Sequence, residues 1–432
     1  MHRNFRDKVL NGKPKWPPVH FREPKNERKE TMKAVKIVAI FIFGGLALFF
    51  ILIMWRGMFR GTWSWWVGGT RVETGPDYKL VQEKELPAES IDSLEIRYRN
   101  FMSVIFYENS DDTILIREYL NFTPSNKQLS EIKTAGDTVT VQGPKTNFYT
   151  GSFLPTPNGY TEIWLPSKIY DSLSVQTVSG DIRSDFPLAP GALTANSTSG
   201  DITFPDLESD RTSVSTISGD ILLSSVSGAS VSLSTTSGNI VTGDISGESN
   251  VSTTSGDITT SLLGDGTVST TSGDITTALL GGGTVSTTSG EVRITEAEKN
   301  LSVNSVSGDV RVESLNAPFS FNTTSGEIIV ENGSGSGKAS SVSGDIRLSL
   351  TDALTGNLTL NTTSGDIALA LPETSSFYLD FDSTSGSCNT FFDDRLSFNK
   401  RGNQASGEYG SNSENKLNVS TTSGDLRITK AD

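Results

Sequence analysis

The sequence predicts an all-β fold, a parallel β-helix (β-solenoid) of about 14 coils, preceded by a single transmembrane α-helix. Three observations lead to this prediction. A motif of Ser-Gly, an acidic residue and an aliphatic residue recurs at intervals of 17 to 21 residues. Apolar residues stand at fixed offsets from each glycine of the motif. Nineteen consecutive uncharged and mostly apolar residues, 37–55, come before the first copy.

The repeated motif is the strongest signal, because self-similarity at a period of this length marks an architecture of stacked repeats. A fainter copy, Ser406-Gly-Glu-Tyr409, fills the one interval of double length. The glycines of the clear copies are Gly180, Gly200, Gly219, Gly238, Gly256, Gly273, Gly290, Gly308, Gly326, Gly344, Gly365, Gly386 and Gly424.

One copy of the motif reads as strand, corner, strand and a glycine-containing return. In the copy that begins at Val268, residues Val268, Thr270 and Ser272 alternate with Ser269 and Thr271, which is the period of a strand with one buried face. Gly273 then turns the chain, since glycine tolerates the positive φ that a sharp corner can need. Ile275 resumes the inward face.

Equal offsets in stacked coils place equal side chains above one another, so the apolar columns form the core. Burial of each aliphatic side chain contributes roughly 1.5 to 3 kcal/mol. Five residues before the glycines stand Val175, Ala195, Val214, Leu233, Val251, Val268, Val285, Val303, Phe321, Ala339, Leu360, Phe381 and Val419. Two residues after them stand Ile182, Ile202, Ile221, Ile240, Ile258, Ile275, Val292, Val310, Ile328, Ile346, Ile367, Cys388 and Leu426. The only cysteine is therefore expected inside the solenoid, where it is unreactive.

Two other architectures fit less well. A disordered stalk rich in Ser, Thr and Gly would not keep apolar residues at fixed offsets, and no proline occurs between Pro205 and Pro318. A left-handed hexapeptide helix would need a strict coil length. The drifting coil length favours a right-handed or irregular solenoid.

The first 33 residues read as a flexible, basic cytoplasmic tail. Residues 1–36 carry eleven Lys and Arg against four acids, a charge of +7. Because the whole chain carries −14, the remainder carries −21. The tail either binds anionic lipid headgroups or serves only as a topological signal.

Residues 34–56 are predicted to be an uncleaved transmembrane anchor, because the apolar stretch is long enough to cross a bilayer and no small-residue cleavage site follows it. The basic flank before the anchor places the N-terminus in the cytoplasm. The protein is therefore expected in the plasma membrane as a single-pass protein with an extracytoplasmic repeat region. Trp55, Trp63, Trp65 and Trp66 suit the interfacial aromatic belt.

The remaining chain divides into a juxtamembrane linker (57–88), a strand-rich N-terminal cap (89–170) and the repeat region (171–432). Terminal coils of a solenoid are expected to be irregular because they cap the stack. Strands of the cap are predicted at residues 93–98, 103–107, 113–117, 138–141 and 161–165.

The order of these segments resembles a known family. A strand-rich opening, then Glu162-Ile-Trp-Leu-Pro-Ser167, then Leu173-Ser-Val-Gln-Thr-Val-Ser-Gly-Asp-Ile182 and its iterations are similar to the bacterial putative-adhesin family of uncharacterised β-helix proteins. The resemblance covers roughly residues 90–430 and implies a β-helix fold. It implies adhesion only through the family's name, and it brings no catalytic residues.

The residue after each glycine is usually acidic, so stacking produces a carboxylate column whose repulsion must be offset. In one interpretation each carboxylate accepts hydrogen bonds from backbone N–H groups of the corner. In the other the column binds Ca²⁺, which prefers carboxylate and carbonyl oxygens, and this is the only cofactor that the sequence suggests. The candidate ligands are Asp181, Asp201, Asp220, Asp257, Asp274, Asp309, Asp345 and Asp366.

No singular cluster for catalysis appears in the sequence. The arginines of one column recur with the repeat, as expected of a surface and not of an active site: Arg183, Arg293, Arg311, Arg347 and Arg427. His2 and His20 both lie in the tail, so no histidine is available outside the membrane. The irregular segments are the insertion at 390–414 and the coil that carries Lys338.

The sequence therefore predicts a non-enzymatic protein, a membrane-anchored rod that acts as an adhesin or cell-envelope scaffold. Its expected partners are the lipid bilayer and cell-surface glycan or envelope proteins, and not nucleic acid, since the region outside the membrane is acidic. Two alternatives remain: a regulatory protein that senses envelope stress, and a β-helix enzyme that acts on acidic polysaccharide.

Overall fold

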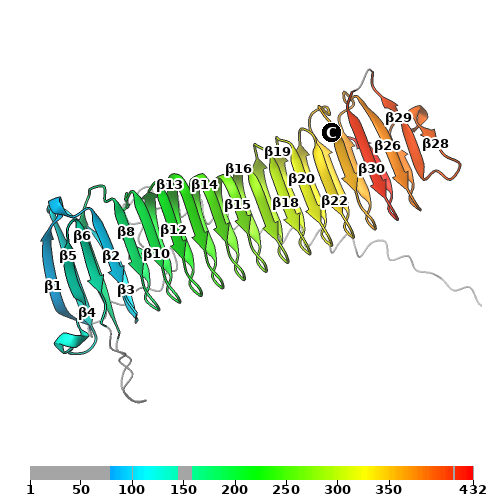
Figure 1. Cartoon of the computed structure of the whole chain (residues 1–432). Coiled ribbons are helices and arrows are strands. Elements are labelled where there is room, and N and C mark those ends of the chain that lie inside the picture. Colours follow the sequence, from blue (N-terminus) through cyan, green and yellow to red (C-terminus); the bar gives the residue numbers. More distant parts are fainter. Residues whose placement is uncertain (1–77, 100, 145–157, 412–413, 432) are drawn as a thin grey trace, which may run out of the picture. The chain divides into compact units, whose positions relative to one another are not determined.

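The computed structural model describes residues 78–99, 101–144, 158–411 and 414–431, which belong to a compact unit spanning Gly69–Asp432. These residues form an all-β solenoid (Figure 1), as predicted. The tail 1–33, the anchor 34–56 and the linker up to residue 77 lie outside the described residues. Within the described ranges, no helix has the length and apolar character needed to cross a membrane.

Each strand that flanks a corner of the repeat region pairs in parallel with the equivalent strand of the neighbouring coil. Four long strands run from one corner to the next: β13 (Ile221–Ser234), β14 (Ile240–Ser252), β15 (Ile258–Ser269) and β16 (Ile275–Thr287). The other strands before a corner are β8 (Ser172–Gln176), β10 (Ala192–Asn196), β12 (Arg211–Ser215), β18 (Leu301–Ser305), β20 (Phe319–Thr323), β22 (Gly337–Ser341), β24 (Leu358–Asn361), β26 (Phe377–Ser383) and β30 (Lys416–Thr421). The other strands after a corner are β9 (Ile182–Ser184), β11 (Ile202–Glu208), β17 (Val292–Ala297), β19 (Val310–Leu315), β21 (Ile328–Gly333), β23 (Ile346–Leu350), β25 (Ile367–Leu371), β27 (Cys388–Thr390) and β31 (Leu426–Lys430).

The two predicted apolar columns form the core. Val251, Val268 and Val285 are direct partners in successive coils, and Ile258 lies opposite Ile275. Every member of the column before the corner is at most 2% exposed. The column after the corner is equally buried apart from Cys388. The period of two in the sequence therefore predicted the buried face of the strands correctly.

The corner differs from the prediction in two respects. Ser272 is exposed and not inward, because strand β15 ends at Ser269 and the residues after Thr270 form an outward bend. No corner glycine of the described residues has a positive φ. Glycine is needed instead because successive corners lie in contact, and a Cβ added to Gly200 would lie 2.1 Å from the carbonyl oxygen of Gly180.

The N-terminal end of the stack is closed by antiparallel strands. Strands β2 (Ser93–Arg97), β3 (Met102–Asn109), β6 (Thr138–Gln142) and β7 (Gly159–Pro166) continue the parallel stack, and the strands predicted for this region are confirmed. Strand β4 (Thr113–Leu120) pairs antiparallel with β7, and β5 (Glu131–Ala135) pairs antiparallel with β6. Two short 3₁₀ turns, η1 (Ala88–Ser90) and η2 (Asn126–Gln128), connect these strands.

Strand β1 (Lys79–Pro87) forms the outer edge of the cap and pairs antiparallel with β4. The sequence assigned these residues to the linker 57–88, which is wrong for residues 79–87. The strand was missed because charged residues dominate it and no face of it is fully buried. Charged side chains on an edge strand also discourage pairing with other chains.

A buried carboxylate lies in the cap. Glu118 on β4 is 2% exposed, and its oxygens accept hydrogen bonds from the N–H and the hydroxyl of Ser130. Burial raises the pKa of Glu118 above its ordinary value of 4.5, against the smaller opposing effect of these two hydrogen bonds. The hydroxyl of Ser130 also lies 3.2 Å from the hydroxyl of Tyr98, and Tyr98 in turn contacts that of Thr161 at 2.6 Å.

We expect Glu118 to make the stability of the cap depend on pH. Because its pKa is raised by folding, its stabilising contribution is complete below pH 4.5 and falls as the pH rises through the folded pKa. The variant Glu118→Gln should therefore lose this part of the pH dependence while keeping a polar side chain. The measurement compares the denaturation midpoints of the two proteins at pH values below and above 4.5. Parallel pH profiles would contradict the assignment.

The C-terminal end contains one repeat fewer than predicted. The faint copy Ser406–Tyr409 is not a coil, because residues Gln404–Tyr409 form strand β29, which pairs antiparallel with β26. Strand β28 (Ser397–Phe398) pairs antiparallel with β29, and the 3₁₀ turn η3 (Asp393–Arg395) precedes it. In the described part of the chain, the stacked corners therefore consist of the thirteen clear copies.

Candidate functional site

A ladder of buried hydroxyl groups explains the Thr or Ser that stands three residues before each corner glycine. The hydroxyl of Thr235 donates to the carbonyl of Gly219 in the preceding coil (3.0 Å) and accepts from the N–H of Gly238 in its own coil (3.2 Å). Thr216 and Ser341 make the same pair of bonds. These hydroxyls satisfy corner backbone groups that the strand ladders do not reach, as buried polar groups require.

A second ladder runs outside the corner and is made by the predicted carboxylate column. Oδ1 of Asp181 accepts from the N–H of Asp201 (3.0 Å), and Oδ1 of Asp201 accepts from the N–H of Asp220 (2.9 Å). The bond repeats through Asp220, Asn239, Asp257, Asp274, Asp309, Asp345, Asp366 and Asp425. The interpretation that these side chains bind corner backbone is therefore confirmed, with the N–H supplied by the next coil.

The side-chain length of Asp and Asn is essential to this ladder. Where Glu stands in the column, the bond to the next N–H is replaced by an ion pair. Glu291 pairs with Arg293 at 2.6 Å, and Glu327 pairs with Arg347. The uncharged Asn239 keeps the ladder because its amide oxygen accepts the same bond (2.9 Å). The column therefore serves to accept backbone N–H groups. This role needs a side-chain oxygen but no formal charge.

The proposed metal ligands remain spread along the stack. In the described ranges, no three His, Cys, Asp or Glu side chains gather as a group that could hold a metal ion. Each Asp of the column stands one coil from the next, and one of its oxygens is already occupied by a backbone N–H. The Ca²⁺ expectation stays a prediction, and the ladder accounts for the column independently of a cation.

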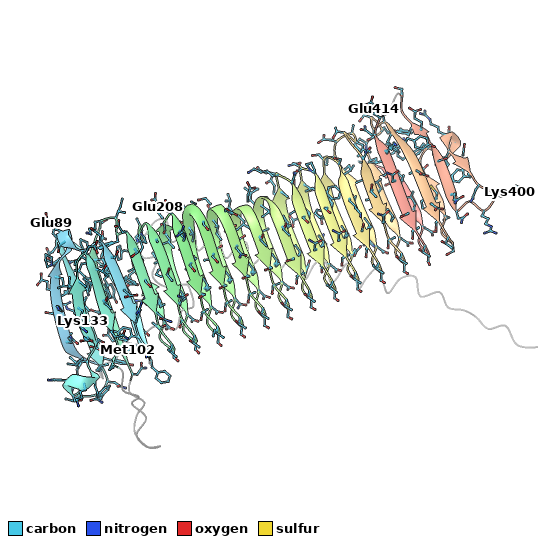
Figure 2. All side chains as sticks on the ribbon, viewed as in Figure 1. Glu89, Met102, Lys133, Glu208, Lys400 and Glu414 are labelled. Carbon is cyan, nitrogen blue, oxygen red and sulfur yellow. The ribbon has the colours of Figure 1, made fainter. Side chains whose placement is uncertain are left out.

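One outward strip of the stack, two residues wide, is free of charge over eight consecutive coils, although Arg211, Glu248 and Asp265 stand beside it on the same strands. We call it the hydroxyl face; its residues stand six and four positions before the corner glycines and are Thr194, Asn196, Ser213, Ser215, Ser232, Ser234, Asn250, Ser252, Thr267, Ser269, Thr284, Ser286, Ser302, Asn304, Ser320 and Asn322. Long side chains gather instead at the two ends, around Lys133 and Lys400 (Figure 2). This face was not predicted from the sequence, although the sequence shows that these alternate positions carry no charge.

The face after the corner is chemically different. Its arginine column is paired with acids: Arg183 with Asp185, Arg293 with Glu291, and Arg311 with Glu331. Thr259 and Thr276 occupy the same column between these arginines and are exposed. Of the arginines that the sequence offered for polysaccharide chemistry, Arg183, Arg293, Arg311 and Arg347 therefore hold neighbouring carboxylates of the same stack, whereas Arg427 is exposed.

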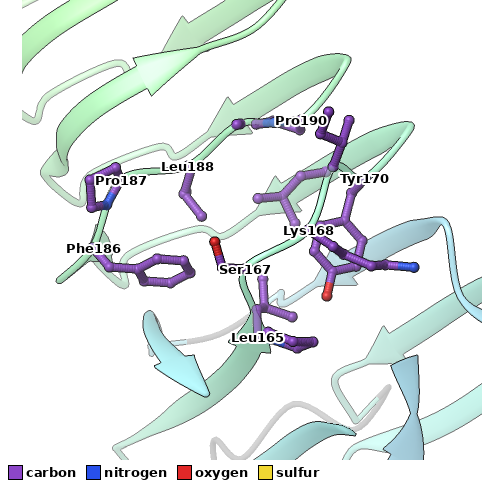
Figure 3. A pocket seen from close by; sticks show the side chains of 12 residues that line it. Leu165, Ser167, Lys168, Tyr170, Phe186, Pro187, Leu188 and Pro190 are labelled. Carbon is purple, nitrogen blue, oxygen red and sulfur yellow. The ribbon is translucent and has the colours of Figure 1, made fainter. Parts of the chain in front are cut away.

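A pocket of about 170 Å³ lies where the cap meets the repeats (Figure 3). The segments after β7 and β9 line it, with Lys168, Tyr170 and Phe186 among the side chains that surround it. Ile169 at this pocket is 76% exposed. The Tyr170 hydroxyl is buried without a hydrogen-bond partner, and burial raises its pKa. The pocket is small and mainly apolar, and Lys168 is the one charged residue among those that line it.

The two irregular segments named by the sequence have structural roles. In the insertion 390–414, Phe391 and Phe392 pack edge to face with ring centres 5.0 Å apart, and both contact Tyr409. Arg395 lies over the Tyr409 ring at 5.2 Å. This aromatic cluster covers the last coil. Lys338 is exposed on β22 next to Ser320, where it ends the uncharged stretch of the hydroxyl face.

Cys388 occupies its predicted column but is only half-buried. It lies opposite Leu426, as the register predicts, and it packs against the core. The prediction that Cys388 lies fully buried was wrong, because its strand β27 belongs to the last coil of the stack. Burial, and secondarily the Asp393 carboxylate, raise the pKa of the thiol to about 12.

We expect this thiol to react slowly, because the thiolate is the nucleophile and little of it exists near pH 8. Alkylation by iodoacetamide in the native protein should be roughly a hundredfold to a thousandfold slower than for a free cysteine. Denaturation should restore the ordinary rate. Mass spectrometry of the time course measures this, with Cys388→Val as the unlabelled control. Rapid native labelling would contradict the assigned environment.

The model of the Toastrack DUF4097 family matches residues 91–296 and 263–429. The chain is similar to the crystal structure of a putative cell adhesion protein from Clostridium sporogenes, with 10% identity, coverage of 81% of this chain and 99% of that chain, and a TM-score of 0.16. It is also similar to a putative adhesin from Parabacteroides merdae, with 13% identity, coverage of 64% and 98%, and a TM-score of 0.32. Comparison with curated protein sequences gives no match.

Proposed function

The chain belongs to the Toastrack DUF4097 family, and from this premise we propose that its solenoid is a non-enzymatic, adhesin-like binding module held at the plasma membrane. The hydroxyl face is the observation that carries this proposal. A chain with 86 charged residues, 36 basic and 50 acidic, keeps sixteen outward positions in eight coils free of charge.

The chemistry of the hydroxyl face suits an uncharged, hydroxyl-rich polymer, so the proposed ligand is a neutral glycan of the cell envelope. Ser, Thr and Asn side chains both donate and accept hydrogen bonds. Polyanions such as nucleic acid fit poorly, because the face has no Lys or Arg and the chain carries a net charge of −14.

Repetition supports binding better than catalysis. Equivalent side chains recur at the strand spacing of about 4.8 Å, so a regular polymer can contact several coils at once. Each contact is weak, but linked contacts raise the overall affinity far above that of one coil. An active site would instead need one singular arrangement of reactive groups.

Matched charge insertions on two faces of the same coils test the proposal. The variant Thr267→Lys/Thr284→Lys places two charges on the hydroxyl face, and Thr259→Lys/Thr276→Lys places two on the face after the corner. Binding of the full-length chain in detergent to an immobilised uncharged glucan and to an acidic polyuronate is measured. We expect the first variant to bind the glucan at least about tenfold more weakly and the second to bind normally. Equal effects of both variants, or tighter binding to the polyuronate, would refute the assignment.

Membrane attachment is the second part of the proposal and rests on residues 34–56 of the sequence. Protease added to intact spheroplasts should degrade the solenoid and spare the basic tail. A mature protein that lacks residues 1–60 would overturn this orientation. Signalling of envelope stress and cleavage of acidic polysaccharide remain alternatives, and no contact of the described residues favours either. Arg183, Arg293 and Arg311, which the sequence offered for polysaccharide chemistry, are held by acids.

A further inference from the structure

The coils at the C-terminal end are not stacked in chain order. Strands β30 and β31 come last in the chain, yet they lie between the coil of β24 and β25 and the coil of β26 and β27. In Figure 1 the red strand β30 accordingly stands inside the orange strand β26. The segment 415–431 thus fills a position that exists only because an earlier part of the chain lies beyond it.

The inserted segment makes all the contacts of an internal coil. Its strand β30 pairs with β24 on one edge and with β26 on the other. Oδ1 of Asp366 accepts from the N–H of Asp425 (2.9 Å), and Oδ1 of Asp425 accepts from the N–H of Ser387 (2.8 Å). Leu417, Val419, Leu426 and Ile428 are at most 2% exposed.

Removal of this segment would leave a slot and not a closed end. The coils on its two sides stand two strand spacings apart, about 9.6 Å, which is too far for direct hydrogen bonds. Both walls would present unpaired backbone groups and an apolar floor, which is the condition for accepting another strand. In the described residues, β26 and β27 pair with the parallel strands of the stack only through β30 and β31.

The connection to the inserted segment is longer than it needs to be. Strands β29 and β30 both pair with β26, on opposite edges, so Tyr409 and Lys416 stand two strand spacings, or about 10 Å, apart. Seven residues of chain can span about 23 Å. This excess length lets the segment reach a second copy while β29 stays paired with β26, once the hydrogen bonds of Ser411 and Asn415 to Ser376 and Leu354 open.

We propose that this slot is a self-association site, in which residues 415–431 of one copy fill the slot of a second copy. This segment is the occupant because the slot requires a glycine where Gly424 meets Gly365 and apolar side chains at the four buried positions, and the other coils that share this pattern are already paired inside the stack. An exchanged pair keeps every contact of the closed monomer, so exchange is limited by the connection alone. This proposal is independent of what the hydroxyl face binds.

Paired cysteines report the exchange. Ser420 on the segment donates to Asn361 on the slot wall (2.7 Å), so Asn361→Cys/Ser420→Cys in a Cys388→Val background forms a link within one copy when closed and between copies when exchanged. The control pair is Asn304→Cys/Asn322→Cys, since Asn322 donates to Asn304 (3.1 Å) between two internal coils. Isotopically light and heavy full-length chains are mixed in detergent, concentrated, warmed and oxidised.

We expect mixed-isotope links for the first pair and links within single copies for the control. Links within single copies for both pairs at every concentration would overturn the proposal, and mixed links for both pairs would do so too, because they indicate non-specific association.

A variant that cannot insert its own segment gives a second readout. A Cβ added at Gly424 would lie 1.8 Å from the Gly365 carbonyl oxygen, so Gly424→Val in the full chain should leave the slot open. A labelled synthetic peptide of residues 415–431 should bind this variant and not the unaltered chain, and the same peptide with Gly424→Val should not bind. Equal binding of both peptides, or binding of neither, would contradict a specific slot.

Discussion

Replacement of Thr235 by valine is expected to lower the free energy of unfolding by about 2 to 5 kcal/mol. The exchange keeps the shape of the side chain but removes the hydroxyl that joins two coils. The Gly219 carbonyl loses its donor, and the Gly238 N–H loses its acceptor. Both groups are buried, and each unsatisfied group costs about 1 to 3 kcal/mol.

The neighbouring residue supplies the control. Thr236 is exposed, so Thr236→Val should change the stability by no more than about 0.5 kcal/mol. Thr235→Ser keeps the hydroxyl and should cost only about 1 kcal/mol for the lost methyl group. Urea denaturation of the three variants decides the matter. If Thr235→Val and Thr236→Val were equally stable, the hydroxyl ladder would have no energetic role.

Substitution of a corner glycine is expected to be at least as severe. In Gly273→Ala the new Cβ would lie 1.9 Å from the Gly256 carbonyl oxygen and 2.5 Å from its carbonyl carbon. Both are backbone atoms, so the coils must separate, which also breaks the bond from the N–H of Asp274 to Asp257 (2.9 Å). We expect a loss of about 3 kcal/mol or more.

A glycine of the same coil outside the corner serves as the control for this substitution. The Cβ of Gly281→Ala would meet its nearest atoms at 3.3 Å, a tight contact that a shift of a few tenths of an ångström relieves. The stability should change by about 1 kcal/mol or less, because the reduced entropy of the unfolded chain offsets the small crowding. Thermal unfolding of both variants provides the comparison. Similar midpoints would show that the corners do not need glycine.

The stacked fold could be predicted from the sequence because the core is strictly periodic. Inward positions such as Val268 and Ile275 keep the same offset in every coil, and the stack converts equal offsets into contacts. The order of the end coils could not be predicted in this way. The local pattern of residues 415–431 is that of any other coil. It therefore does not show whether β30 pairs with β24 or stacks beyond the preceding strands of the chain.

The surface ladders were predictable only in part. One interpretation of the sequence was that the Asp column binds backbone N–H groups of the corner. The donor is a residue one coil away, so the length of the hydrogen bond depends on the spacing between coils. Positive φ at the corner was a reasonable expectation for glycine, yet the close approach of Gly180 and Gly200 is a tertiary contact that no local pattern contains. The exposed Ser272 shows that strand alternation ends where the bend begins.

Function is expected to be distributed over interchangeable coils. Deletion of residues 257–290 removes two coils in register and joins Gly256 to Glu291, so that Val292 meets the column of Ile240. Affinity of this full-length variant for the uncharged glucan, together with its thermal unfolding, is the most direct measurement. We predict a folded protein that still binds, more weakly, because fewer coils contribute to the same surface. A folded variant that has lost all binding would contradict the account, since it would locate function in a singular site.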